Sequence, residues 1–280
     1  MKNSTENVWF VTGASKGLGL SLVKRLLNEG YKVAATSRSL KDLENAVGNH
    51  TNFLPLTVDL LNEQSVADAV SKTINKFGSL DIVVNNAGYG MVGALEELSD
   101  AESRQNFDVN VFGSLNVIRQ AMPYLRKRQS GHIFNISSVA GFTGGFPGFG
   151  IYCATKFAVT GFTESLAIEA KPFGVKVTLV LPGYFRTNFL ESDSLAVPRN
   201  QMEEYSDVRA IQTAHQDEIR GNQPGDPEKG VAAIIQAADA PNPPLYLFLG
   251  SDSLQFSRQK IDMVENEIDT WKEVTASTDF

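Results

Sequence analysis

Cysteine and histidine are scarce in this sequence of 280 residues. Cys153 is its single cysteine, and one cysteine cannot form an intrachain disulfide. The three histidines, His50, His132 and His215, are scattered and form neither a paired helical motif nor a cluster with cysteine. We therefore expect no metal site, and we interpret each histidine as an ordinary surface or loop residue.

An excess of positive charge and long apolar runs are also lacking. The net charge is -7, which argues against a nucleic-acid partner because phosphate binding needs a concentrated basic face. No apolar run is long enough to span a bilayer, and the polar residues 1–6 lack the apolar core of a signal peptide. The sequence thus predicts a cytoplasmic protein without nucleic-acid or membrane partners, and its length suffices to bury a substantial core.

The N-terminal segment 8–19 changes from an apolar run into closely spaced glycines and then into an amphipathic stretch. This order predicts a strand, a tight turn and the start of a helix. Gly13, Gly17 and Gly19 permit positive φ angles and let a phosphate approach the backbone, and a helix N-terminus offers free N–H donors. A nucleotide phosphate is the natural ligand for such a loop, and a tight turn without any ligand is the alternative.

Short apolar runs alternate with amphipathic stretches along the rest of the chain. We expect strands near residues 31–36, 53–58, 80–85, 132–137, 176–181 and 245–249, and helices near residues 16–28, 62–77, 100–128, 152–171 and 227–239. Strands separated by helices imply right-handed crossovers and a doubly wound parallel sheet with helices on both faces. In this α/β fold, ligands bind at the carboxyl ends of the strands, where the strand order reverses.

Two segments depart from the alternation. Residues 188–225 follow a strand end and mix charged with apolar side chains, so we interpret them as an insertion that covers the substrate site as a lid. Residues 251–280 carry apolar side chains at helical spacing and are interpreted as an amphipathic helix that packs on the body. The expected division is a catalytic and cofactor-binding domain over residues 1–250, with the insertion inside it, and a C-terminal helical extension.

A tyrosine and a lysine stand four residues apart at the start of the expected helix 152–171. This spacing places Tyr152 and Lys156 on one helix face, where a nearby ammonium group lowers the pKa of a phenol and makes the pair a general acid/base. The same spacing occurs elsewhere in the chain without special meaning. Tyr152 is distinguished because it follows a strand that ends in Ser137 and Ser138, whose hydroxyl groups are suited to hold a carbonyl oxygen.

These residues resemble the short-chain dehydrogenase/reductase family. The family's motifs occur in order over about residues 8–250, and they are Thr12-Gly13-x3-Gly17-x-Gly19, Asn85-Asn86-Ala87-Gly88, Asn110, Ser138, Tyr152-x3-Lys156 and Pro182-Gly183. The resemblance implies a single-domain Rossmann fold, a nicotinamide cofactor, and hydride transfer between that cofactor and a carbonyl or alcohol. It also implies a homodimer or homotetramer, formed through the helices near residues 100–128 and 152–171.

The resemblance assigns a catalytic role to four residues. Tyr152 is expected to donate the proton, and Lys156 to lower its pKa and bind the nicotinamide ribose. Ser138 is expected to hold the substrate oxygen, and Asn110 to support a water that relays protons to Lys156. Ser138 and Tyr152 are one residue further apart here than in the commonest members, and the loop glycines Gly144 and Gly145 can absorb the extra residue. We therefore choose Ser138 over Ser137.

The resemblance also implies a set of cofactor contacts. Asp59 is expected at the adenine, Asn86 to Gly88 beside the adenosine ribose, and Thr187 at the carboxamide. The full set of expected cofactor-binding residues is Gly13, Ser15, Lys16, Gly17, Leu18, Gly19, Ser37, Arg38, Asp59, Leu60, Asn86, Ala87, Gly88, Tyr152, Lys156, Pro182, Gly183 and Thr187.

The end of the second strand decides between the two nicotinamide cofactors. Relatives that prefer NAD carry an acidic residue there, whereas this chain has Arg38 after Thr36 and Ser37. Arginine can hold a 2'-phosphate by charge-assisted hydrogen bonds, and Lys16 in the glycine loop adds a second cation. The expected cofactor is therefore NADP(H).

The loops beside the expected pocket are rich in aromatic residues and lack an arginine pair for a carboxylate. The lining residues expected there are Tyr89, Met91, Phe142, Phe146, Phe149, Phe185 and Phe189. They favour a bulky, apolar or aromatic ketone or aldehyde as the small-molecule substrate. One alternative is a 3-oxoacyl-carrier-protein reductase, which would use the basic run 126–128 to bind its acidic partner. Another is a non-catalytic NADP(H)-binding sensor, although such a protein would be expected to lose Tyr152 or Lys156.

Overall fold

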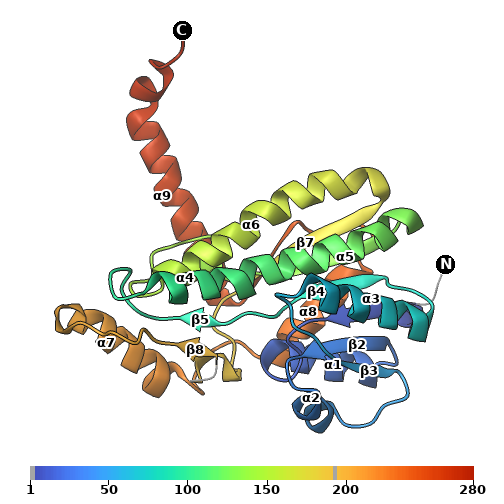
Figure 1. Ribbon diagram of the computed structural model, residues 1–280. Helices are drawn as coiled ribbons and strands as arrows, with labels where there is room; N and C mark the ends of the chain where they lie inside the picture. Colours follow the sequence, from blue (N-terminus) through green and yellow to red (C-terminus); the bar gives the residue numbers. More distant parts are fainter. Residues whose placement is uncertain (1–3, 192–193) are drawn as a thin grey trace.

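Seven parallel strands form the central sheet of the protein, which a computed structural model describes over residues 4–191 and 194–280 (Figure 1). In chain order they are β1 (Val8–Val11), β2 (Lys32–Ser37), β3 (Phe53–Thr57), β4 (Ile82–Asn85), β6 (Gly131–Ile136), β7 (Val175–Pro182) and β9 (Tyr246–Leu249). Their spatial order is β3-β2-β1-β4-β6-β7-β9. The strand order therefore reverses between β1 and β4, and the expected doubly wound sheet is confirmed.

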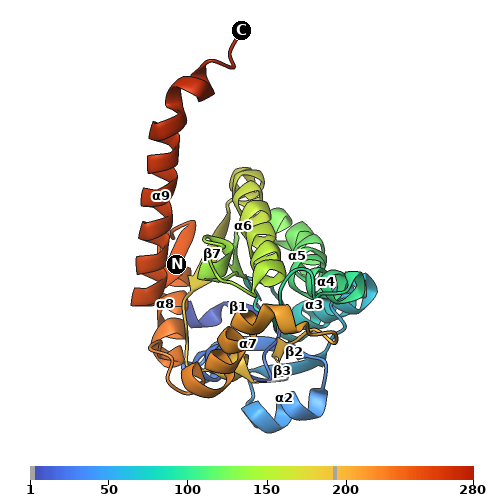
Figure 2. The same cartoon turned by 90° about the vertical axis from the view of Figure 1, so that its left-hand side faces the viewer.

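Helices cover both faces of this sheet (Figures 1 and 2). One face carries α1 (Gly17–Asn28), α2 (Leu40–Val47) and α8 (Pro227–Asp239), and the other carries α3 (Glu63–Phe77), α5 (Gly113–Arg128) and α6 (Gly150–Ala170). Strand β1 supplies both cores, since Trp9 and Val11 belong to one apolar cluster and Phe10 to the other. This two-residue alternation in a fully buried strand explains why β1 is an unbroken apolar run in the sequence.

The structure contains elements that the sequence patterns did not predict. Helix α2 was missed although Ser39 caps it by accepting a hydrogen bond from the backbone N–H of Asp42 (3.3 Å). Strands β5 (Gly90–Met91) and β8 (Leu195–Ala196) pair in parallel, and two residues are too few to show any periodicity. The single helix expected over 100–128 is divided into α4 (Asp100–Phe107), a π-helical turn (Asp108–Phe112) and α5.

The C-terminal helix α9 (Ser251–Ala276) packs on the body only through its first turns. There, Ser253 Oγ donates a hydrogen bond to the Leu181 carbonyl (2.7 Å), and the Phe256 ring lies 5.4 Å from that of Phe146. From residue 262 onward every residue is exposed, and the helix projects away from the sheet (Figures 1 and 2). The expected packing helix is thus correct for its base and wrong for its outer half. In the described parts of the chain, no helix, α9 included, is both long enough and apolar enough to cross a bilayer.

Two histidines are buried, which corrects their interpretation as surface residues. His132 lies on β6 with its Nε2 atom 2.9 Å from Thr178 Oγ1, and burial together with the charge of Lys176 lowers its pKa to about 3. His215 is buried inside the insertion 188–225. A polar residue at a buried strand position, with a hydroxyl partner on the next strand, carries no signal in a single sequence.

The buried His132 makes stability depend on pH. Its pKa is about 3 in the folded state and 6.5 when exposed, so only the unfolded state gains its proton between these values. We expect this residue to reduce the free energy of unfolding by about 2 kcal/mol when the pH falls from about 7.5 to about 5. Urea titrations of His132→Gln should show a smaller loss over this range than wild type. The exposed His50→Gln is the control, and an unchanged loss in His132→Gln would contradict the expectation.

Candidate active site

A cavity of about 690 Å³ opens at the carboxyl ends of the strands, beside the reversal of strand order between β1 and β4. Most of the residues selected from the sequence line it, and these are Gly13, Ser15, Lys16, Gly17, Leu18, Ser37, Arg38, Asp59, Leu60, Asn86, Ala87, Gly88, Ser138, Tyr152, Lys156, Pro182, Gly183 and Thr187. Gly19 and Asn110 lie behind this lining. The chain therefore brings together residues that are far apart in the sequence, from Gly13 in the glycine loop to Thr187 after β7.

The three loop glycines serve different purposes. A Cβ atom on Gly13 would lie 2.7 Å from the Ala87 Cα, and one on Gly19 would collide with the Asn86 side chain. These two glycines let segment 86–88 pack directly on the loop. Gly17 has a φ of +59°, and a Cβ there would meet only Thr187, at 3.9 Å. Gly17 therefore serves the turn itself and leaves its outer side open to the cavity.

The start of α1 is suited to an anion. Lys16 is the N-cap residue, and because a lysine ammonium has no acceptor, its side chain cannot cap the N–H groups of the first turn. Gly17 and Leu18 of this turn line the cavity. A first turn without a side-chain cap and the positive end of the helix dipole favour a phosphate at this position.

Tyr152 and Lys156 project from adjacent turns of α6 and are 7% and 5% exposed. Lys156 Nζ donates a hydrogen bond to the Ile136 carbonyl (3.0 Å) and lies 5.8 Å from the centre of the Tyr152 ring. Burial raises the pKa of Tyr152, and a hydrogen bond with Ser138 acts in the opposite direction. Burial also lowers the pKa of Lys156 to about 8. Lys156 is not among the groups that shift the pKa of Tyr152, so the expected lowering of the phenol's pKa by the ammonium is not found, and burial raises this pKa instead.

The two serines after β6 have different surroundings. Ser137 Oγ donates a hydrogen bond to the Lys156 carbonyl (3.0 Å), which ties β6 to α6. Ser138 Oγ accepts one from the Ala140 N–H (3.1 Å) and is the hydroxyl that meets Tyr152. This arrangement supports the choice of Ser138 over Ser137 for contact with a substrate oxygen.

Asn110 lies in the π-helical turn and is buried. Its Oδ1 atom accepts a hydrogen bond from the Tyr89 N–H (3.0 Å), and its Nδ2 group donates to the Tyr89 carbonyl and to Thr155 Oγ1 (both 3.0 Å). A Cβ atom on Gly88 would lie 3.0 Å from Asn110 Oδ1 and 3.6 Å from Lys156 Nζ. Asn110 therefore joins the loop after β4 to α6 directly behind Lys156, and π-helical turns are frequent at functional sites.

Charged side chains gather at the end of the cavity near β2. Arg38 follows this strand, is exposed and lines the cavity together with Lys16. Asp59 is also exposed, and its Oδ1 atom accepts a hydrogen bond from the Leu61 N–H (3.0 Å). Two cations therefore stand at the cavity end where the sequence predicts the adenosine phosphate.

The opposite end of the cavity is apolar. The rings of Phe149 and Phe189 lie 6.3 Å and 5.9 Å from that of Tyr152, and Leu190 and Leu195 belong to the same apolar cluster. Six of the seven expected pocket residues line the cavity, namely Tyr89, Met91, Phe146, Phe149, Phe185 and Phe189. Phe142 is the exception, because it packs edge-on against Phe248 at 5.3 Å.

Sequence reasoning missed a tyrosine and a histidine that face the same cavity. His215 Nδ1 lies 2.8 Å from the Ile211 carbonyl, so this nitrogen carries the proton and Nε2 is left as the acceptor. The hydroxyl of Tyr184 donates to Nε2 over 2.9 Å. Tyr184 directly follows Pro182-Gly183 at the end of β7, which was a usable signal, whereas nothing in the sequence of the insertion distinguishes His215.

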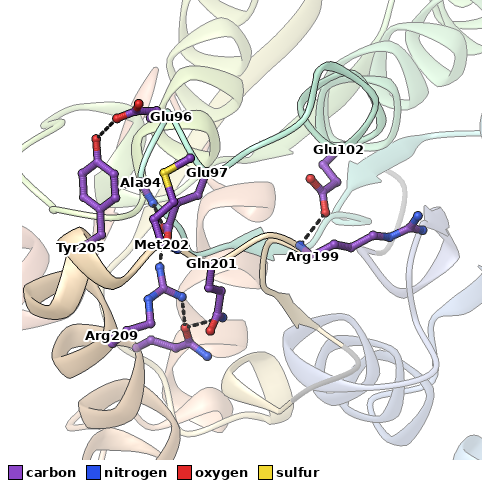
Figure 3. A network of polar contacts seen from close by, with 10 residues as sticks. Ala94, Glu96, Glu97, Glu102, Arg199, Gln201, Met202, Tyr205 and Arg209 are labelled. Carbon is purple, nitrogen blue, oxygen red and sulfur yellow. Dashed lines mark hydrogen bonds and ion pairs between the residues drawn. The ribbon is translucent and has the colours of Figure 1, made fainter.

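The insertion 188–225 is tied to the body by a polar network around Glu97 (Figure 3). The carboxylate of Glu97 is buried, accepts hydrogen bonds from the N–H groups of Ala94 (2.8 Å) and Met202 (2.9 Å), and pairs with Arg209 of α7 (Ser206–Thr213). The Tyr205 hydroxyl donates to the exposed Glu96 (2.6 Å) at the edge of this network. Removing one partner of a buried ion pair is strongly destabilising, so Glu97 is one anchor of the insertion, beside the pairing of β5 with β8.

Known proteins resemble this chain over most of its length. A family model described as short chain dehydrogenase matches residues 7–197. A 3-ketodihydrosphingosine reductase from Bacteroides thetaiotaomicron is 38% identical over 242 residues, which is 86% of each chain. A short-chain dehydrogenase from Streptomyces avermitilis has a solved structure that superposes with a TM-score of 0.89 and 35% identity, over 98% of this chain and 99% of that one.

A further solved structure bears on the cavity. The protein ElxO, in a structure with NADP bound, superposes with a TM-score of 0.72 and 28% identity, over 89% of this chain and 99% of that chain. The family motifs expected from the sequence therefore coincide with an independent family match and with the observed fold. On this combined basis the protein is an oxidoreductase that belongs to the short-chain dehydrogenase family.

Proposed function

We propose that this protein is an NADP(H)-dependent reductase that converts a bulky, apolar ketone or aldehyde into an alcohol, with Tyr152 as the proton donor. The observation that carries the proposal is the position of Tyr152 and Lys156. Both are buried side chains on one face of α6, at the junction between the phosphate-binding end of the cavity and its apolar end. A proton donor at this junction lies where a cofactor and a carbonyl substrate would meet.

The residues present fit NADP(H). The first turn of α1 and the open side of Gly17 suit the diphosphate, and Arg38 with Lys16 suits the additional 2'-phosphate. NADPH, when bound, supplies the hydride for the reduction. Thr187, at 3.9 Å from a Cβ placed on Gly17, is positioned for the nicotinamide end in this proposal.

The chain's own groups manage the proton. The Tyr152 phenol stays protonated at neutral pH because burial raises its pKa, so it is available to donate to the developing alkoxide. Ser138 holds the substrate oxygen from the other side. Lys156, whose pKa is about 8, is mainly protonated at pH 7 and stabilises the phenolate that the transfer leaves behind.

The apolar end favours a substrate without strong charge. Phe149, Phe189 and Met91 surround the space beside Tyr152, and the Tyr184–His215 pair offers a polar contact on one wall. The relative named 3-ketodihydrosphingosine reductase, which is 38% identical, agrees with a ketone as the substrate. In the basic run 126–128, Arg128 pairs with Asp81 (2.6 Å) and Arg126 lies over the Phe173 ring (5.8 Å). These contacts favour the ketone reductase over the carrier-protein alternative. The insertion 188–225, held by Glu97, acts as the lid in this proposal.

Removing the proposed proton should separate catalysis from binding. Tyr152→Phe keeps the ring and is expected to lower kcat by about 100-fold or more, with NADPH affinity nearly unchanged. The assay follows NADPH absorbance with aryl ketones, long-chain alkyl ketones and an acetoacetyl thioester. Tyr124→Phe, on α5 with the same spacing to an arginine, is the control and should keep wild-type activity. Wild-type protein that binds NADPH but reduces none of these compounds would favour the sensor alternative.

Lys156 should determine the alkaline limb of the pH profile. Because its pKa is about 8, the ammonium is present below this pH and is lost above it, while the phenol of Tyr152 remains protonated. We expect kcat/KM for reduction to be constant near pH 7 and to fall above about pH 8. Lys156→Arg, which stays charged throughout, should show lower activity without this fall. A fall that persists unchanged in Lys156→Arg would assign the limb to another group.

The cofactor preference should depend on Arg38. Arg38→Asp replaces a cation with a carboxylate that repels a 2'-phosphate, so we expect KM for NADPH to rise about tenfold or more while KM for NADH stays nearly unchanged. Steady-state kinetics with both cofactors measures the ratio. Lys127→Asp makes the same change of charge outside the cavity and should preserve the ratio. An Arg38→Asp enzyme that retains the wild-type preference would contradict the NADP(H) assignment.

A further inference from the structure

The outer half of α9 presents apolar side chains to water. Met263, Val264, Ile268, Trp271 and Val274 are between 38% and 61% exposed, and this part of the helix projects beyond the body (Figures 1 and 2). Isolated helices of this length are marginally stable in water, and their stability normally comes from an apolar face packed on something else. The apolar face of the projecting half of α9 therefore does not pack on the described part of its own chain, although such packing normally stabilises a helix.

The spacing of these side chains indicates what covers them. Ser257, Ile261, Val264, Ile268, Trp271 and Thr275 follow one another at alternating intervals of four and three residues. We call the last five of these residues the α9 seam. An alternation of four and three residues is the repeat of a left-handed coiled coil, in which the seam packs against a seam of the same kind. The repeat favours another helix as the partner over a flat protein surface.

We propose that the α9 seam pairs with the α9 seam of a second copy of this chain, in an antiparallel two-helix coiled coil. The direction follows from the base of the helix. Ser253 and Ser257 lie on the side of α9 that continues into the seam, and both are buried against their own body. In a parallel pair, the first turns of the second helix would have to lie beside Ser253 and Ser257, where the body of the first copy already packs. An antiparallel helix instead approaches with its C-terminal end and avoids the body.

The charges beside the seam select one register. When Ile268 packs beside Trp271 of the second copy, Glu265 lies near Lys272 of the second copy, and the two-fold symmetry repeats both contacts. Shifting one helix by seven residues in one direction would place Glu265 beside Glu265 of the second copy. The opposite shift would place Lys272 beside Lys272 of the second copy. Like charges disfavour both shifts. Glu267 faces the uncharged Val274 in the selected register.

The length of the seam agrees with this arrangement. Ile261 to Thr275 spans about 21 Å, so the two bodies stand at opposite ends of the pair without overlapping. Helix α9 contains six acidic and three basic residues, which disfavours an anionic lipid surface as the occupant. The contact is short, so we expect weak, concentration-dependent association. It is separate from α5 and α6, where the family resemblance implies a different interface.

Trp271 provides a direct reporter of this contact. The protein has two tryptophans, and Trp9 is fully buried in the core. Quenching of fluorescence by acrylamide therefore reports mainly on Trp271, whatever other faces associate. For full-length protein, we expect quenching to decrease as the protein concentration rises, together with a rise in the mass measured by sedimentation. Because the contact is expected to be weak, the test extends to a protein concentration of about 100 µM. Quenching that does not change with protein concentration over this range would overturn the proposal.

Charge exchange tests the direction and the register. Lys272→Glu sets Glu265 against glutamate in both contacts, and it should weaken the association seen in the Trp271 signal about tenfold. The double variant Glu265→Lys with Lys272→Glu restores opposite charges in the antiparallel pair and should recover the wild-type association. In a parallel pair the same double variant would set the introduced lysine against Lys260 and the introduced glutamate against Glu267. Failure to recover would therefore overturn the antiparallel arrangement.

A matched control and a second occupant complete the test. Glu267→Lys lies opposite Val274 and should leave the association within about threefold of wild type, whereas a parallel pair would lose it because the introduced lysine would face Lys272. Ile268→Glu places a charge in the seam and should abolish the concentration dependence, with circular dichroism verifying that the body is folded. Protection of Trp271 only on addition of phosphatidylcholine or phosphatidylglycerol vesicles would overturn the proposal in favour of a lipid surface.

Discussion

The close approach of the segment after β4 to the glycine loop after β1 is the constraint on which the site depends. The Asn86 side chain donates hydrogen bonds to the carbonyls of Thr12 (2.9 Å) and Gly13 (3.0 Å), and the Thr12 hydroxyl accepts from the N–H groups of Asn86 and Ala87. These bonds join the two strands at the point where the strand order reverses. They satisfy polar groups that would otherwise be buried without partners, and they hold the loop open on its other side. The cavity is the space that this junction leaves.

Burial then determines the chemistry of the groups around that space. The same loss of water contact raises the pKa of Tyr152 and lowers that of Lys156, because burial disfavours the charged form of each group. Pairs of titratable groups with shifted pKa values are typical of acid/base sites, whereas Tyr124 and Arg128, which have the same spacing on α5, are exposed. A tyrosine and a cation four residues apart on one helix face are therefore a common arrangement. The position of Tyr152 and Lys156 under the insertion distinguishes this pair.

The sheet and most cavity residues were predictable because they depend on local patterns and on the order of motifs. Unbroken apolar runs identify the strands of a parallel sheet, and their alternation with helices implies which ends meet. The rest depends on contacts between distant residues. The buried His132 has a hydrogen-bond partner in Thr178 on the next strand. Phe142 lies outside the cavity because its ring packs against that of Phe248. The pairing of β5 with β8 and the place of His215 likewise follow from the folded insertion, whose sequence has no periodic pattern.

The way in which the insertion is attached has a consequence for how such a site can diversify. One wall of the cavity, including Phe189 and His215, belongs to the insertion, and the wall that includes the glycine loop belongs to the sheet and α1. The insertion is held on the body by the polar network around Glu97, by the pairing of β5 with β8 and by an apolar cluster that includes Tyr152. Changes in shape or polarity within residues 188–225 can therefore alter which compounds fit, while the glycine loop, Tyr152 and Lys156 remain as they are. The range of substrates and the binding of the cofactor can in this sense change independently of each other within a single fold.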